Sequence, residues 1–226
     1  MKIEDLNVYY DLLQEKYGEK DLKAIYNGGC KENPDLCFVF MNPTKRNIAA
    51  SKDWKGIRAP WIGTKNIWDL FFRLNLMDEE IYKKIKEYKS NEWTESFAEE
   101  VYKDIEKHKY FITNLAKCTQ LDARQLENRV FKEYLQLLKK EIQIINPKIV
   151  ILFGNQVSSI VLDKKISVSQ CRKKMFELEI NDKKYITYSV YYPVGNGRFN
   201  IGKAIEDIEW IIKEGELRKE LKIYLE

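Results

Sequence analysis

Hydrophobic positions along the chain form four short continuous runs, and the segments between them have helical spacing. The runs lie near residues 37–41, 110–113, 148–153 and 186–191. Apolar runs of this length, bounded by Asn, Pro or Gly, are typical of strands buried on both faces of a parallel sheet. The pattern therefore predicts an α/β fold, a three-layer α/β/α sandwich with a four-stranded, mainly parallel sheet.

Apolar residues spaced by three and four in the remaining segments predict helices on both faces of this sheet. The strongest helical pattern spans residues 126–145, and Asn146-Pro147 ends it. Weaker helical patterns cover residues 3–17, 65–76, 79–89, 94–107, 156–162 and 201–212. Because no linker rich in Pro, Gly or Ser interrupts the pattern, we expect residues 1–226 to form a single domain.

Two local patterns predict changes of chain direction. Residues 175–180 and 185–191 flank Asn181-Asp182, which predicts a hairpin that leads into the last strand. Asn27-Gly28-Gly29 predicts a turn, because these residue types tolerate the backbone angles that turns require.

Composition narrows the class of protein. The chain has 226 residues, of which 44% are hydrophobic and 33% charged, enough for one large core under a solvated surface. No apolar run approaches the length of a membrane span, and the first residues do not form a signal peptide. We expect a cytoplasmic monomer without a membrane partner.

Cysteine and histidine usage argues against a metal centre. The four cysteines, Cys30, Cys37, Cys118 and Cys171, form no C-x-x-C pair, and His108 is the one histidine. Zinc and iron–sulfur sites need closely spaced Cys or His ligands. We therefore expect no metal and no other cofactor, with the cysteines reduced and packed as small hydrophobic residues.

The net charge is only +4, but the positive charge is unevenly distributed. It gathers in two segments, residues 45–73 and 164–174. The first holds Lys45, Arg46, Lys52, Lys55, Arg58, Lys65 and Arg73, with Asp53 and Asp69 as its acids. Such segments are compatible with phosphate contacts, and charge alone leaves open whether they are simply solvated faces.

Three of the predicted strands end in polar or chain-breaking residues: Asn42-Pro43, Asn114 and Tyr192-Pro193. In a parallel sheet the carboxyl ends of the strands lie along one edge, where open α/β sheets place their sites. Neighbouring strands would thus build one site from three loops. Asn42 could instead only start a turn, and Asn114 could only cap its strand.

Five segments at or near these strand ends resemble motifs of a known family. They are F-M-N-P-T (40–44), R-A-P-W-I-G (58–63), F-I-T-N-L-A-K-C (111–118), P-K-I-V-I-L-F-G (147–154) and Y-P-V (192–194). In order and spacing they resemble the uracil-DNA glycosylase superfamily. The first segment resembles G-I-N-P-G of its mismatch-specific branch. The second segment resembles R-P-F-V-G. The thermostable iron–sulfur branch has I-T-N-x-x-K-C and P-K-x-I-x-x-L-G, and H-P-S or N-P-S stands in the last position.

The resemblance covers roughly Cys37 to Ile212. It implies a DNA glycosylase that hydrolyses the N-glycosidic bond of a deaminated base, with uracil expected, flipped out of DNA for base excision repair. Asn42 would be catalytic by positioning water, since a neutral amide is a poor proton acceptor.

Further residues have expected roles in such a site. Trp61 would stack on the base, unless it is a core tryptophan, and Asn114 would pair with the base edge. Met41 and Tyr192 complete the base-binding set; the Tyr192 hydroxyl could donate to the departing base or simply pack. The residues expected to contact DNA are Lys45, Arg58, Asn196 and Arg198.

The chain also departs from the family pattern. Phe40 and Thr44 replace the two glycines of the first motif, Tyr192 replaces the loop histidine, and the iron–sulfur cysteine pattern is missing. A catalytically silent nucleic-acid-binding module on the same fold is therefore an alternative. A nucleotide-dependent enzyme is another, although neither G-x-G-x-x-G nor a Walker sequence is present. We expect His108 at the surface and Asp53 as a solvated loop charge.

Overall fold

The computed structural model describes residues 1–123 and 126–223, and the side chains of these residues except Asn196 and residues 216–223. Its centre is a mixed sheet of six strands in the order β1-β3-β2-β4-β6-β5. The strands are β1 (Asn27–Gly29), β2 (Leu36–Phe40), β3 (Tyr110–Asn114), β4 (Ile149–Phe153), β5 (Met175–Ile180) and β6 (Lys183–Val190).

The four predicted strands are the four parallel ones, β3, β2, β4 and β6, and they lie side by side. The α/β class is confirmed, but the prediction of four strands is wrong because β1 and β5 add antiparallel edges. β5 and β6 form the predicted hairpin around Asn181-Asp182.

The predicted turn at Asn27-Gly28-Gly29 is instead the short strand β1, paired with residues 111–113 of β3. Gly29 has a φ of +98°, and a Cβ there would collide with the carbonyl oxygen of Tyr110. The glycines therefore permit a close approach to β3 rather than a reversal of the chain.

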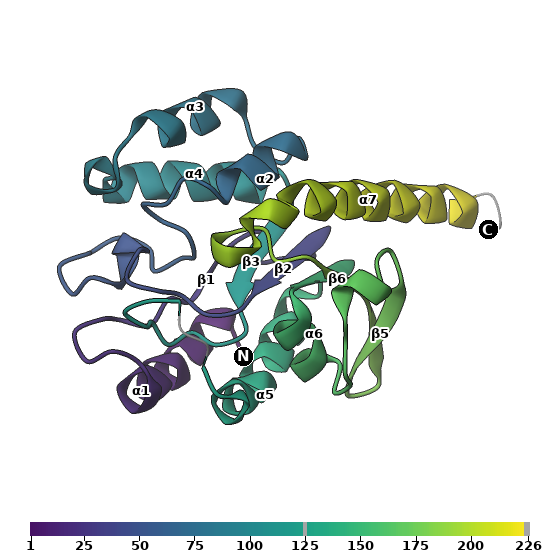
Figure 1. Ribbon diagram of the computed structural model, residues 1–226, viewed down its shortest axis with the longest axis horizontal. Coiled ribbons are helices and arrows are strands. Elements are labelled where there is room, and N and C mark those ends of the chain that lie inside the picture. The colour runs from purple at the N-terminus through teal and green to yellow at the C-terminus, as the bar shows by residue number, and fades with distance from the viewer. Residues whose placement is uncertain (124–125, 224–226) are drawn as a thin grey trace.

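Helices cover both faces of the sheet (Figure 1). Above it in that view lie α2 (Trp68–Arg73), α3 (Glu79–Glu87), α4 (Glu95–Lys107) and α7 (Ile201–Ile223). Below it lie α1 (Asn7–Tyr17), α5 (Asn128–Ile145) and α6 (Asn155–Val161). Short 3-10 helices span Ile3–Leu6, Ile48–Ala50, Ser90–Glu92, Val168–Gln170 and Gly195–Asn200. The predicted layering is thus confirmed, although α2 is shorter than the pattern at residues 65–76 indicated.

Alternation along the strands divides the core into two hydrophobic clusters. All residues of β2, β3 and β4 are buried. Phe38 and Phe40 of β2 pack in the cluster under α2, α4 and α7, whereas Cys37 and Val39 pack in the cluster under α1, α5 and α6. Successive side chains of a strand point to opposite faces, so the face of each residue at the strand ends is fixed by this register.

Two expectations from composition can be compared with the structure. The four cysteines are free thiols, and Cys37 and Cys118 are buried. Among the described residues, no helix has the length and apolar character that crossing a bilayer requires.

Candidate active site

The carboxyl edge of the parallel strands brings the predicted strand-end residues together. Phe40 at the end of β2 is paired with Asn114 at the end of β3. The pairing continues beyond the strands, because the N–H groups of Leu115 and Ala116 donate to the carbonyl oxygens of Phe40 (2.7 Å) and Met41 (3.0 Å). These bonds fix the backbone that leads into Asn42 relative to Asn114, so both amides belong to one edge as expected.

Asn42 is 8% exposed and carries a polar atom without a partner. Its side-chain nitrogen donates to the carbonyl oxygen of Pro43 at 3.2 Å. Its side-chain oxygen is buried and accepts no hydrogen bond from the described residues. Buried polar atoms are nearly always paired, so an unpaired one calls for an explanation such as a bound water or ligand.

Trp61 is held in an unusual backbone conformation, with a φ of +70°. Bulky residues rarely adopt left-handed angles, and such strain clusters at functional sites. The loop around it is tied down: the Tyr102 hydroxyl donates to the carbonyl oxygen of Pro60, and Asn47 donates to that of Ala59 at 2.8 Å. The indole N–H of Trp61 is buried and has no partner among the described residues. The Trp61 side chain is partly buried and packs against the hydrophobic cluster that contains Phe40.

Asn114 is 2% exposed, and its side-chain amide forms no hydrogen bond with another residue that the structure describes. Its backbone carbonyl accepts a hydrogen bond from the Lys117 ammonium at 2.8 Å. By alternation from Ile112, the Asn114 side chain lies on the same face of the sheet as Phe40.

A buried charged network supports the end of β3 from the opposite face. Lys117 and Glu141 are both 0% exposed and form an ion pair at 3.0 Å. Glu141 also accepts hydrogen bonds from the Thr113 hydroxyl and the Asn27 amide, both at 2.7 Å. Burial lowers the pKa of Lys117, while the Glu141 carboxylate opposes that shift. Tyr10 contributes a hydroxyl to Glu141 at 3.4 Å.

This network was missed in the sequence, although two signals point to it. Lys117 stands between the apolar residues Ala116 and Cys118. Glu141 stands one residue before Ile142 on the inward face of α5. A buried lysine and a buried glutamate are each costly alone, so the presence of both predicts that they pair.

Tyr192 and Met41 occupy different faces of the site. The Tyr192 ring lies edge-on to Phe40, with ring centroids 6.2 Å apart, and burial raises the pKa of its hydroxyl. The Met41 side chain packs against the cluster on the α5 side. A base contact of Met41 would therefore fall to its main chain.

The residues expected to contact DNA differ in their exposure and in the contacts that they already make within the protein. Lys45 is exposed and forms no ion pair with another described residue. Arg58 already pairs with both carboxylate oxygens of Asp11, at 2.8 and 3.0 Å, and lies over the Tyr26 ring. Arg198 is exposed beside Phe199, which is 81% exposed. The side chain of Asn196 lies outside the described part of the structure.

Two other charged residues, Arg172 and His108, contact acidic residues within the protein. In the second basic segment, Arg172 pairs with Glu206 and Asp207. His108, expected at the surface, is partly buried and contacts Asp78 at 3.0 Å and Asp104 at 3.6 Å, because it caps α4 beside the start of α3. Asp53 is exposed, as expected.

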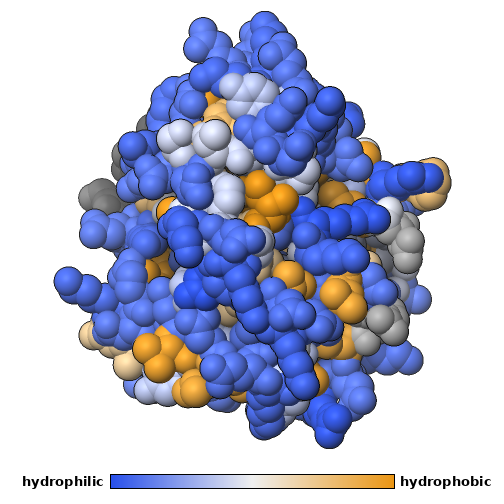
Figure 2. Space-filling view, turned by 90° about the vertical axis from the view of Figure 1, so that its left-hand side faces the viewer, coloured by the Kyte–Doolittle hydropathy of each residue, from blue (hydrophilic) through white to orange (hydrophobic). Residues whose placement is uncertain are grey.

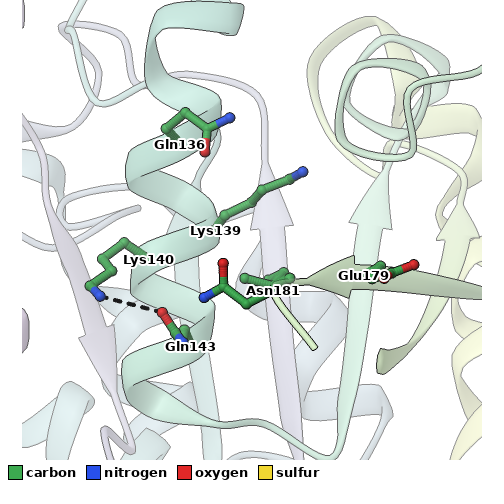
Figure 3. A pocket seen from close by; sticks show the side chains of 7 residues that line it. Gln136, Lys139, Lys140, Gln143, Glu179 and Asn181 are labelled. Atoms are coloured by element: carbon green, nitrogen blue, oxygen red, sulfur yellow. Dashed lines mark hydrogen bonds between the residues drawn. The ribbon is translucent and has the colours of Figure 1, made fainter. Parts of the chain in front are cut away.

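Two surface hollows lie away from these amides. One, of about 260 Å³, lies between α5 and the turn that precedes β6, at the amino edge of the sheet (Figure 3). The other, of about 280 Å³, is lined by residues of the first helices and by residues 56–58. Figure 2 shows the side that carries α1 and the loop between β2 and α2; it is mostly hydrophilic, with small separate hydrophobic areas.

The chemistry available at the edge is that of neutral groups: two amides, an indole N–H and a phenol. They can bind a polar planar molecule and hold a water, and none is a strong base.

The sequence profile described as "Uracil DNA glycosylase superfamily" matches residues 28–207, which include the whole of this edge. The chain belongs to this superfamily. The resemblance found in the motifs is thereby confirmed.

One curated member of the superfamily is similar over part of its length. The "Type-4 uracil-DNA glycosylase" of Sulfurisphaera tokodaii is 27% identical over 93 residues. The matched segment is 39% of this chain and 42% of that protein. The match therefore spans less than half of either protein.

In the present protein, the most marked departure from the family motifs at the site is Phe40. It stands where the similar motif has glycine, and its side chain is fully buried. Its ring stacks on Phe153 at 4.3 Å and lies edge-on to Trp61 at 5.0 Å. An aromatic ring thus occupies the space between residues that were expected to surround a base.

Proposed function

We propose that this protein is a DNA glycosylase that hydrolyses the N-glycosidic bond of a deaminated base, uracil, in base excision repair. The observation that carries the proposal is the placement of Asn42 and Asn114 at one sheet edge, where the Asn42 oxygen and the nearby Trp61 indole N–H are buried without partners among the described residues. Membership of a superfamily named for this activity supports it.

The residues would share the reaction as follows. The nucleotide leaves the stack and enters the site, where Trp61 contacts the base and the Asn114 amide pairs with its imide edge. The Asn42 oxygen holds the water whose oxygen bonds to the sugar C1′ as the C1′–N bond breaks. The bonding electrons leave with the base as an anion, to which the neutral Tyr192 hydroxyl can donate a hydrogen bond. The water, now bonded to C1′, loses one proton to the solvent, and the departed base anion takes up a proton from the solvent.

DNA would be held by the exposed basic side chains next to this edge. Lys45 and Arg198 are available for phosphates, whereas Arg58 would first have to leave Asp11. Phosphate contacts position the protein without reading sequence. The expectations of a cytoplasmic monomer without cofactor, folded as one domain, stay predictions.

The test is abasic-site formation on oligonucleotides that carry uracil, hypoxanthine, xanthine or a mismatch. We expect cleavage of the uracil substrate. Asn42→Ala should lower its single-turnover rate about 10²-fold or more with nearly unchanged DNA binding, because water placement acts in the transition state. Asn114→Asp replaces the amide donor by an acceptor and should also reduce uracil removal.

Equal rates for the wild type and both variants would place the site elsewhere. The burial of Phe40 between Trp61 and Phe153 favours a second candidate, a nucleic-acid-binding module without catalysis. DNA binding without cleavage of any modified base would support that second function.

A further inference from the structure

Phe40 lies at the centre of the residues assigned to the base. It is 0% exposed, and its ring contacts three others, those of Phe153, Trp61 and Tyr192. The fourth neighbour is Asn114, its partner in the β2–β3 register on the same face of the sheet. Three of these four neighbours, Trp61, Asn114 and Tyr192, are therefore members of the base-binding set.

The interactions of the Phe40 ring are those a pyrimidine would make in the same place. Phe153 stacks on it with an interplanar angle of 15°, and Trp61 and Tyr192 meet it edge-on at 77° and 84°. A phenyl ring can satisfy these aromatic contacts but offers nothing to a hydrogen-bonding group. The buried indole N–H of Trp61 accordingly has no partner among the described residues.

We infer that Phe40 occupies the base-binding space of this protein, so that a base can enter only when the Phe40 ring is displaced. The inference rests on the proposed function. It makes Phe40 the residue that determines which bases are admitted and how fast.

The size of the ring makes this testable with a small molecule. Removal of a buried aromatic side chain leaves a cavity, and such cavities can bind a molecule that resembles the deleted group. Phe40→Ala should open a slot for one six-membered ring beside Asn114, the register partner of Phe40. Free uracil, the proposed product, is the probe because it matches that slot in shape and supplies polar edge groups.

The matched control is Phe38→Ala. Phe38 is also 0% exposed, points to the same face two residues earlier on β2, and stacks on Phe153 with centroids 6.0 Å apart. It contacts Phe71 and Tyr110 in the interior instead of Trp61 and Tyr192. Phe38→Ala thus removes the same buried group without opening the site.

The experiment measures uracil-induced thermal shifts and single-turnover uracil excision for wild type, Phe40→Ala and Phe38→Ala. We expect millimolar uracil to raise the Tm of Phe40→Ala alone, and Phe40→Ala to excise uracil at least tenfold faster than wild type. Phe40→Leu, which keeps more of the buried volume, should show both effects in weaker form and serves if Phe40→Ala does not fold.

The outcomes separate this inference from the proposed function. Uracil binding by the Phe40 variant without excision by either protein supports the inference and refutes the glycosylase activity. A folded Phe40 variant that neither binds uracil nor excises it faster overturns the inference, while excision by the wild type still decides the proposed function. A uracil shift in Phe38→Ala as large as in Phe40→Ala also overturns it.

Discussion

At the scale of single residues, two of the eight buried side-chain polar atoms that lack a partner among the described residues lie at the sheet edge. Leaving a buried polar group unpaired costs about 1–3 kcal/mol. The Asn42 oxygen and the Trp61 indole N–H both carry this cost, and Trp61 adds a left-handed backbone. Of the eight residues with such an atom, Trp61 is the one that also has a positive φ, and residues that weaken the fold in this way are retained where function requires them.

The neutral character of the site predicts its pH dependence. The amides of Asn42 and Asn114 do not titrate, and burial raises the pKa of Tyr192, so its hydroxyl keeps its proton. With enzyme in excess over uracil-containing DNA, the excision rate should be flat between about pH 5.5 and 9. A rate that climbs with pH through about 6.5, the ordinary range of histidine, would show that an ionisable base acts instead.

A site residue could be predicted from the sequence when it directly followed a predicted strand. Asn42, Asn114 and Tyr192 follow apolar strand runs, so the rule that parallel strands end on one edge brings them together. The role of Phe40 could not be predicted in this way, because its neighbours Phe153 and Tyr192 are distant in sequence and meet it only in the folded sheet. In the sequence it was simply the end of a strand with an unexpected side chain.

At the scale of elements, the Lys117–Glu141 pair joins β3 to α5 and, through Asn27, to β1. Lys117→Met should lower the free energy of unfolding by about 3–5 kcal/mol, because it leaves Glu141 as a buried charge without its partner. Urea unfolding monitored by circular dichroism measures this. Lys16→Met is the control, since Lys16 pairs with Glu133 at the surface and should contribute less than about 1 kcal/mol.

A double variant separates charge from shape in the same network. Lys117→Met with Glu141→Leu removes both charges, and buried ion pairs can often be replaced by apolar residues at little cost. The double variant should therefore be more stable than Lys117→Met alone. If Lys117→Met is as stable as wild type, the ammonium does not hold the end of β3.

The elements that sequence predicted best were those with long apolar patterns. α5 and the strands β2, β3 and β4 match the prediction because their burial dictates the pattern. β1 was missed because three residues are too few to show a period, and its glycines also fit a turn. Its pairing depends on contact with β3, which local sequence does not encode.

At the scale of the whole molecule, some basic side chains are available to bind phosphates, whereas others already form ion pairs within the protein. Lys45 and Arg46 are exposed three and four residues after Asn42 and form no ion pair with the other described residues. Lys173 pairs with Glu206 at 2.7 Å, and Lys184 pairs with Glu177 at 2.9 Å. The net charge of +4 conceals this difference, which is why composition alone left nucleic acid undecided.

The salt dependence of DNA binding tests this distinction. Each phosphate contact contributes about −0.9 to the slope of log affinity against log salt on duplex DNA. Lys45→Ala with Arg46→Ala should weaken binding and reduce the steepness of that slope by up to about 2. Lys173→Ala with Lys184→Ala removes the same charge from residues that are paired within the protein, and should leave the slope unchanged. Fluorescence anisotropy of labelled duplexes at several salt concentrations measures both. If the two pairs of substitutions change the slope equally, net charge alone governs binding, and the loop after Asn42 does not contact the phosphates.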